Sequence, residues 1–423
     1  MKQPEASPGD RRPATTSHGS GEQPAARRPS PETGHRLLRR LLHRLGDPPL
    51  GIELEGGAAA ANPDPVARIR IRDRGTLFRL ALNGAIEFGD AYSDGRLEID
   101  GDLDGMLEEI YRRAPPPSEA PVGGARWLAR SQRGRSNSLR GSRDNIHRHY
   151  DIGNGFYSLW LGPTMAYTCA YYPRPDASLD EAQRAKMDHV ARKLRLAPGD
   201  EVIEAGCGWG SLAIHMARHY GARVRAFNIS SEQVAWARQS AAEAGLGGQV
   251  EFIEDDYRNI QGSCDKFVSI GMLEHVGLDR YEDLGGVISR CLRPDGLGLV
   301  HSIGRNRPAP MHPWIEKRIF PGAYPPSLWE MGRIFQPYDF SVLDVENLRL
   351  HYARTLDHWR SAFERSIERV AEMFDKRFVR MWRLYLAGSA TAFRVGQLQL
   401  FQVLFAPGRS NAVPWTRADL YHG

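Results

Sequence analysis

The 423-residue chain has few cysteines and no long apolar run. Its four cysteines stand far apart and form no Cys-x-x-Cys pair, so the sequence supports neither a zinc ribbon nor a dithiol redox site. No stretch of about 20 consecutive apolar residues occurs, which excludes a membrane-spanning helix. The N-terminal region lacks the apolar segment of a secretory signal. We therefore expect a cytoplasmic protein with reduced cysteines and no metal site.

Lysine is also scarce, although the chain as a whole is basic. Six lysines accompany 50 arginines, and the net charge is +5. Arginine grips phosphate through two parallel hydrogen bonds, so this composition fits a phosphate-bearing partner, and a compositional bias of the genome explains it equally well. Between Arg126 and Arg148, seven arginines accompany a single acid, Asp144. We expect this stretch to meet an anionic membrane surface, and we expect no nucleic-acid partner.

Composition divides the chain into four parts. Residues 1–34 predict a disordered tail, because they hold too little apolar surface to offset the entropy of ordering. Residues 35–112 predict a small α+β domain associated with lipid or membrane. Residues 113–143 indicate a linker rich in proline, glycine and arginine. Residues 144–423 alternate strand and helix patterns, which is typical of an α/β fold with a parallel sheet.

The expected N-terminal domain opens with an amphipathic helix. From Leu37 to Leu45, leucines recur on one helical face and cations on the other. Such a helix can lie on an anionic bilayer or pack on its own domain, and the sequence leaves both possibilities open. Alternation predicts strands at 67–72 and 77–80, and residues 103–111 predict a helix.

The C-terminal part begins its regular pattern at a capping box. Ser178 and Glu181 open a predicted helix that runs to Leu194. Further helices are expected at 211–220 and 231–244, and buried strands at 201–204, 222–227, 250–253, 267–270 and 297–301.

A glycine-rich turn follows the strand that ends at Glu204. The glycines are Gly206, Gly208 and Gly210. Glycine lets the backbone turn sharply and approach a ligand where a Cβ would collide. A dinucleotide site requires a third glycine at position 211 and an acid after the second strand, but the chain has Ser211 and Asn228 there. This spacing argues against a dehydrogenase.

The spacing is instead that of methyltransferases that use S-adenosylmethionine. In these enzymes the loop packs on the methionine part of the cofactor, and polar groups after the next strand hold the ribose. We expect Asn228, Ser230 and Gln233 to hold the ribose. Asp255, Asp256 and Tyr257 are placed to face the adenine. The alternative is a glycine turn without a ligand.

Seven characteristic segments, which include the glycine-rich turn, follow one another along the chain. They are HYDIGN at 149–154, MAYTCAY at 165–171, EAGCGWG at 204–210, NISSEQ at 228–233, DYR at 256–258, SIGMLEHVG at 269–277 and HSIG at 301–304. With His351-Tyr352 and the tail from Met381 to Gln402, the chain from 144 to 408 resembles the cyclopropane-fatty-acyl-phospholipid synthases and the related mycolic acid cyclopropane synthases. Residues 35–112 resemble the extra domain of the phospholipid-acting branch, which favours an unsaturated membrane phospholipid as substrate.

This resemblance implies a fold, a reaction and a set of site residues. It implies a Rossmann-like class I methyltransferase fold, with cofactor contacts from Tyr167 and Thr168. The methyl group of S-adenosylmethionine is transferred to a cis double bond, and the resulting carbocation loses a proton to close a cyclopropane ring. The base is a bicarbonate ion. It is held by residues corresponding to Cys169, Glu274, His301 and Tyr352 and by a backbone group at Ile303.

The residue types agree with this chemistry, although each is ambiguous by itself. Glu274 and His301 follow strands at the edge where parallel-sheet sites lie, and an isolated Glu–His pair is more often a solvated turn. A developing cation needs a dry pocket and π-electron density, which aromatic faces supply. Large aromatic residues also occur in hydrophobic cores that have no catalytic function. The candidates are Tyr150, Tyr167, Tyr171, Phe320, Tyr352 and Phe393.

One position departs from the family's usual pattern. Ser389 stands where the family's tail usually has a cysteine. A serine is similar in size, and a bicarbonate-based reaction needs no thiol nucleophile. The change leaves the level of activity and the usual product open.

The leading hypothesis is therefore a cytoplasmic enzyme, peripherally associated with the inner face of the cytoplasmic membrane, that cyclopropanates phospholipid acyl chains. One alternative is a fatty-acyl C-methyltransferase that gives a methyl-branched or methylated-alkene product. Another is a non-catalytic lipid-binding relative. The resemblance also leaves a homodimer open.

Overall fold

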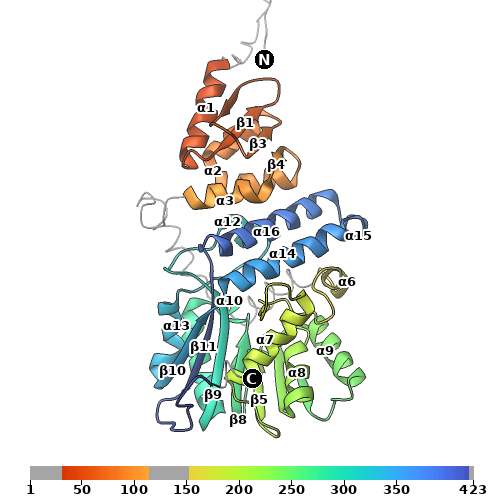
Figure 1. Ribbon diagram of the computed structural model, residues 1–423, viewed down its shortest axis with the longest axis vertical. Coiled ribbons are helices and arrows are strands. Elements are labelled where there is room, and N and C mark those ends of the chain that lie inside the picture. The colour runs from red at the N-terminus through yellow and green to blue at the C-terminus, as the bar shows by residue number, and fades with distance from the viewer. Residues whose placement is uncertain (1–30, 114–151, 419–423) are drawn as a thin grey trace, which may run out of the picture.

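The computed structural model describes residues 31–113 and 152–418 (Figure 1). The expected tail up to residue 30, the linker at 114–143 and the arginine-rich stretch at 126–148 lie outside the described residues. Within the two described ranges, no helix is long and apolar enough to cross a membrane.

The N-terminal unit is a four-stranded sheet with three helices (Figure 1). Its strand order is β2-β1-β3-β4, in which only the β1–β3 pair is parallel. Its elements are α1 (Pro31–Arg44), β1 (Leu50–Leu54), β2 (Ala59–Ala61), β3 (Ala67–Ile71), α2 (Arg74–Ser93), β4 (Leu97–Gly101) and α3 (Leu103–Arg113). Strand β3 and helix α3 confirm the strand expected from residue 67 and the helix expected from residue 103.

The strand expected at 77–80 is wrong, because these residues lie inside helix α2. The carboxylate of Asp73 accepts a 2.8 Å hydrogen bond from the Thr76 N–H and caps the helix. Leu77 and Leu80 are buried at the i, i+3 spacing of a helix, while Phe78 is 61% exposed. Four residues are too short a window to separate this spacing from strand alternation.

Helix α1 begins at Pro31, four residues before the expected start. Leu38 and Leu42 are fully buried and belong to the same core as β1 and β3. Its leucine face therefore packs on its own domain. Of the two alternatives left open by the sequence, this is the one realised, so these leucines are not available to a membrane.

The second unit is a seven-stranded sheet in the order β10-β11-β9-β8-β5-β6-β7. The five strands from β9 to β7 are parallel, and β11 pairs antiparallel with both β9 and β10. The strands are β5 (Glu201–Ala205), β6 (Arg223–Asn228), β7 (Val250–Glu254), β8 (Cys264–Ile270), β9 (Leu292–Gly304), β10 (Phe340–Asn347) and β11 (Gln399–Pro407). This arrangement confirms the predicted α/β fold with a parallel sheet.

Helices cover both faces of this sheet. One face packs on α7 (Leu179–Lys193), α8 (Ser211–Tyr220) and α9 (Ser231–Glu243), and the other on α11 (Tyr281–Cys291) and α13 (Leu328–Phe335). The expected capping box opens α7. The remaining helices are α6 (Asn154–Ser158), α10 (Leu273–Val276), α12 (Pro313–Arg318), α14 (Arg349–Arg365), α15 (Ile367–Met373) and α16 (Lys376–Arg394).

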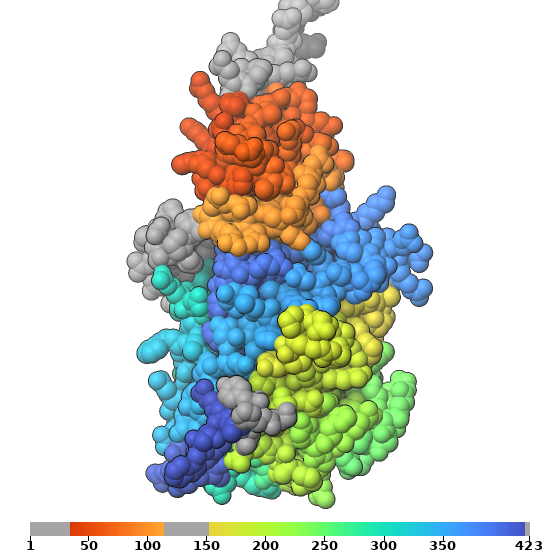
Figure 2. Space-filling model, in the orientation of Figure 1, coloured from red at the N-terminus to blue at the C-terminus, as the bar shows by residue number. Residues whose placement is uncertain are grey.

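Helices α14 and α16 lie between the two units (Figures 1 and 2). Helix α2 packs on α12 and α16, and one hydrophobic core runs from the N-terminal sheet through α14 and α16. Asp90 accepts hydrogen bonds from Trp314 Nε1 (3.2 Å) and from both Nε and Nη2 of Arg318 (2.9 and 2.7 Å). The N-terminal unit is therefore joined to the larger unit by apolar packing and by charge.

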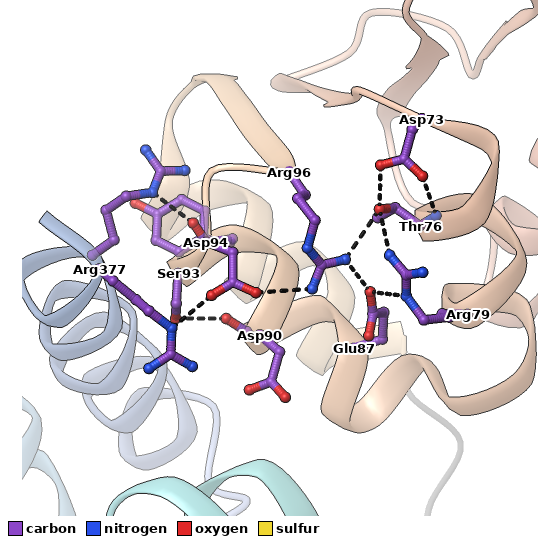
Figure 3. Close-up of polar contacts among 12 residues, drawn as sticks. Asp73, Thr76, Arg79, Glu87, Asp90, Ser93, Asp94, Arg96 and Arg377 are labelled. Atoms are coloured by element: carbon purple, nitrogen blue, oxygen red, sulfur yellow. Dashed lines mark hydrogen bonds and ion pairs between the residues drawn. The ribbon is translucent and has the colours of Figure 1, made fainter.

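A polar network extends this contact along α2 (Figure 3). Arg96 donates to Glu87, Thr76 and Asp94, and Asp94 in turn accepts a 2.6 Å hydrogen bond from Arg377 on α16. These side chains are partly exposed, so each ion pair contributes modestly to stability. Their main effect is to fix the orientation of α2 relative to α16.

Candidate active site

The glycine loop joins β5 to α8 and leaves open space beside its middle glycine. All three loop glycines have positive φ, at 85°, 54° and 85°. A Cβ on Gly206 would lie 2.8 Å from the Cβ of Met272, and one on Gly210 would lie 2.6 Å from the Phe252 ring. A Cβ on Gly208 would meet no atom within 4 Å. The outer two glycines are thus required for packing, and the middle one leaves room for a ligand to approach the backbone.

The residues predicted to hold a ribose gather next to this opening. The Asn228 amide donates to the Gly208 carbonyl (3.2 Å) and to the Gln233 side chain (2.8 Å). Ser230 Oγ accepts from the Gln233 N–H and caps α9. Asn228 therefore links the glycine loop to the start of α9, at the carboxyl end of β6.

The segment expected to face an adenine also lies here, but its carboxylate is already engaged. The Asp255 N–H donates to the Asn228 carbonyl (3.0 Å). Both oxygens of Asp256 accept from the Arg258 guanidinium, at 2.7 and 2.8 Å. Tyr257 is buried beside them. The structure thus places this segment at the opening and uses Asp256 to hold Arg258.

Glu204 lies at the end of β5, beneath the loop, and is 3% exposed. Burial raises the pKa of its carboxyl to about 7, and the charge of Lys186 opposes this shift. Its Oε2 is buried without a hydrogen-bond partner.

Glu274 is the first of a second group of predicted residues. Glu274 lies on α10, directly after β8, and its Oε1 accepts a 2.6 Å hydrogen bond from the Ile303 N–H. The Ile303 amide, expected from the resemblance to face a bound anion, is thus used by Glu274. The Glu274 Oε2 is buried without a hydrogen-bond partner, and burial raises the pKa of this carboxyl to about 7.

His301 lies two residues before Ile303 on β9, so both side chains are on one face of the strand. Its Nδ1 is 3.1 Å from the amide nitrogen of Gln402 on β11. With that amide as the donor, the ring proton resides on Nε2, which is buried without a hydrogen-bond partner. Burial lowers the pKa of His301 to about 3, so the ring is neutral near pH 7.

A run of backbone contacts brings Cys169 and Tyr352 to the same place. The Cys169 Sγ lies 3.2 Å from the Ala170 carbonyl oxygen and 3.8 Å from that of Leu348, and the Leu348 N–H donates to the Leu400 carbonyl. Leu400 pairs with Ile303, and the Tyr352 N–H bonds to Leu348 in the first turn of α14. Burial raises the pKa of the Cys169 thiol far above its ordinary value, so it stays protonated.

Aromatic rings enclose this region. Tyr167 Oη is 2.8 Å from Tyr385 Oη, and Tyr352 packs on Phe393 with ring centroids 4.6 Å apart. Ser389 lies midway between Tyr385 and Phe393 at i+4 spacing, so it shares their face of α16. Phe320 packs edge-on against Tyr385. Tyr171 is instead stacked between the His189 and His351 rings, and Tyr150 lies outside the described residues.

Sequence reasoning assigned no function to three buried polar residues near this group: Gln183, Lys186 and Gln402. Gln402 fixes the His301 ring, and its contact joins strands that are 101 residues apart. The available signal was polar residues inside apolar segments, which by itself does not say what they contact. In the described part of the chain, no group of three or more His, Cys, Asp or Glu residues is placed to hold a metal ion.

Comparison with known proteins finds one matching family model and several relatives. The model described as mycolic acid cyclopropane synthetase matches residues 137–403. A "Probable fatty acid methyltransferase" of Pseudomonas putida is 36% identical over 395 residues, which cover 88% of this chain and 96% of that protein. The cyclopropane-fatty-acyl-phospholipid synthase of Escherichia coli (strain K12) is 34% identical over 388 residues, covering 90% and 95%.

Among solved structures, mycolic acid cyclopropane synthase CmaA1 complexed with SAH and CTAB is similar in fold. The TM-score is 0.59 and the identity 31%, and the match covers 62% of this chain and 97% of that one.

Proposed function

We start from the fact that this chain belongs to the mycolic acid cyclopropane synthetase family, and we propose that it is a cyclopropane-fatty-acyl-phospholipid synthase. Members of this family are S-adenosylmethionine-dependent methyltransferases. The proposed reaction adds a CH₂ unit across a cis double bond of an unsaturated phospholipid acyl chain and releases one proton.

The residues around the glycine loop fit the cofactor. The open space beside Gly208, bordered by Asn228 and Gln233, accommodates a ligand against the backbone. Thr168 lies against Gly271, where an added Cβ would be 3.0 Å from the Thr168 methyl group, and we propose that Thr168 and Tyr167 also contact the cofactor. When bound there, S-adenosylmethionine supplies an electrophilic methyl group on a positively charged sulfonium.

Two orphaned polar atoms are the observation that carries the proposal. Glu274 Oε2 and His301 Nε2 are both buried without a hydrogen-bond partner. The other Glu274 oxygen accepts a hydrogen bond from the Ile303 N–H, and His301 lies two residues before Ile303 on β9. Buried polar atoms are ordinarily paired, so these two unpartnered atoms suit a small polar ligand. A bicarbonate ion fits, because a carboxyl with a pKa near 7 can keep its proton and donate a hydrogen bond to the ion, and a neutral imidazole can donate its N–H.

The side chains of this protein then have separate functions in the proposed reaction. Tyr352 and the protonated Cys169 complete the hydrogen bonds to the anion, the thiol proton turning from its backbone carbonyl to the anion. The anion receives the proton lost on ring closure. Tyr167, Tyr385 and Phe393 exclude water and present π-electron density to the developing cation. This arrangement holds two reactants in line, which a poorly nucleophilic alkene requires.

The substrate places the enzyme at the membrane surface. We propose that it binds the inner face of the cytoplasmic membrane peripherally, with the arginines of the N-terminal domain facing anionic headgroups. On α1 these arginines point outward while the leucines point inward, so the attraction rests on charge.

A second candidate keeps the methyl transfer and changes the fate of the cation, which loses a different proton to give a methylated alkene, or a methyl-branched chain after a separate reduction. Two observations favour it: Ser389 lies on the aromatic face of α16, and the Pseudomonas putida relative is named for fatty acid methylation.

The deciding experiment is lipid analysis of a host that lacks its own cyclopropane synthase. Expression of the wild-type chain should convert unsaturated acyl chains into products that gain CH₂ and lose the double bond, whereas Glu274→Gln should not. Retained unsaturation with added CH₂ would favour the second candidate. Unchanged lipids, together with no S-adenosylmethionine binding by calorimetry, would overturn the proposal.

A further inference from the structure

One face of helix α7 presents two buried polar side chains to the segment that carries Tyr167, Thr168 and Cys169. Gln183 is fully buried and Lys186 is 2% exposed. The Gln183 amide donates to the carbonyls of Thr168 (2.9 Å) and Ala166 (3.3 Å). Lys186 Nζ donates to Thr168 Oγ1 (3.0 Å). Helix α7 thus holds both the backbone and the side chain of this segment.

Lys186 is an unfavourable residue to bury for packing alone. An ammonium loses its hydration on burial, and burial lowers the pKa of Lys186 to about 8. The chain has only six lysines, and a second one on the same helix, Lys193, is buried against the carboxylates of Glu346 and Asp344. Lys186 instead makes its hydrogen bond to a neutral hydroxyl.

The position of Lys186 connects the two halves of the proposed site. Its charge acts on Glu204, beneath the glycine loop, and on Cys169. Thr168, which it holds, lies against Gly271: a Cβ on Gly271 would be 3.0 Å from the Thr168 methyl group. Gly271 begins the turn that leads to Glu274. A displaced Thr168 would therefore disturb both the cofactor side and the anion side.

We propose that Gln183 and Lys186 are positioning residues for methyl transfer, and that they act by fixing Thr168. The proposal rests on the proposed function, because it takes Tyr167, Thr168 and Cys169 as parts of that site. Neither α7 side chain needs to contact the acyl chain. They hold the segment in register with the glycine loop.

The test compares Lys186→Met with Lys193→Met, which removes an equally buried ammonium from the same helix away from Thr168. Lys186→Met should raise the KM for S-adenosylmethionine and lower kcat, with a combined loss on the order of 100-fold in kcat/KM. Lys193→Met should lower the melting temperature and leave that KM near the wild-type value. Equal effects of the two substitutions on KM and kcat would overturn the proposal.

A double-mutant cycle with Thr168→Val probes the same hydrogen bond, and the Thr168 variants by themselves keep the test decisive where Lys186→Met folds poorly. Both substitutions delete the same hydrogen bond, so their combined loss of kcat/KM should be smaller than the product of the single losses. Thr168→Ser retains the hydroxyl and should preserve most activity. Multiplicative losses, or equal loss in the Val and Ser variants, would contradict the inference. A wild-type chain that binds no S-adenosylmethionine would instead overturn the proposed function.

Discussion

The backbone N–H of Ile303 donates a 2.6 Å hydrogen bond to the carboxylate of Glu274. This bond ties the α10 turn to strand β9 and fixes one carboxylate oxygen. The other oxygen remains buried and without a hydrogen-bond partner. The bond therefore orients Glu274 without satisfying it.

Glu274→Gln should abolish most turnover while leaving the fold intact. The glutamine oxygen can still accept from Ile303, but the amide that replaces Oε2 cannot share a proton with an anion. We expect a fall in kcat on the order of 100-fold or more. Steady-state kinetics, with circular dichroism as the check on folding, measures this. A variant with near wild-type kcat would remove Glu274 from the reaction.

The same substitution should change how stability depends on pH. The folded carboxyl has a pKa of about 7, raised by burial from 4.5 in the unfolded chain. Between these values the unfolded chain releases a proton that the folded chain retains, so this group's contribution to the free energy of unfolding falls as pH rises. The fall should total at most about 3 kcal/mol, and Glu274→Gln should lack it. Urea unfolding of both proteins from pH 4.5 to 8 tests this. Parallel profiles would contradict it.

The contact between the N-terminal unit and α12 should be sensitive to a single methyl group. A Cβ on Gly89 would lie 2.3 Å from the Trp314 ring, whereas one on Gly84, in the same helix, would meet no atom within 4 Å. Gly89→Ala should destabilise the protein by about 2 kcal/mol or more through overpacking. Gly84→Ala should be neutral or slightly stabilising. Thermal unfolding distinguishes them, and equal melting temperatures would refute this account of the interface.

Ser389→Cys should retain or raise turnover. Serine and cysteine are similar in size, and the proposed proton acceptor is an anion that neither side chain replaces. Mass spectrometry of the lipid products would also report any shift between ring and methyl-branched chains. Complete loss of activity would instead show that the serine hydroxyl has a specialised function.

Binding to membranes should depend on anionic lipid and on salt. The arginines on the exposed face of α1 attract a negative surface, and such attraction is screened over roughly 10 Å at 0.1 M salt. Sedimentation with anionic and neutral vesicles, at low and high salt, measures this. Binding that is unaffected by salt would argue for apolar insertion.

Local rules explain what the sequence predicted correctly. The capping box at Ser178, the glycine turn and the alternating strands and helices depend on residues within one or two turns of each other. Such patterns can be recognised in the sequence without knowledge of the fold. They also placed Asn228 and Gln233 beside the glycine loop, because parallel strands end at one sheet edge.

Three features required the tertiary structure. The leucines of α1 face inward because a sheet lies beneath them. The Ile303 N–H donates its hydrogen bond to Glu274, and the Gln402 side chain orients the His301 ring.

The sequence by itself thus determined the order of the elements, the glycine turn and the residue types available for chemistry. The tertiary structure decided which of these residues meet. The reason is physical: a hydrogen bond between distant strands, or the side of a helix that becomes buried, depends on neighbours far along the chain, and a local pattern of polarity does not specify them.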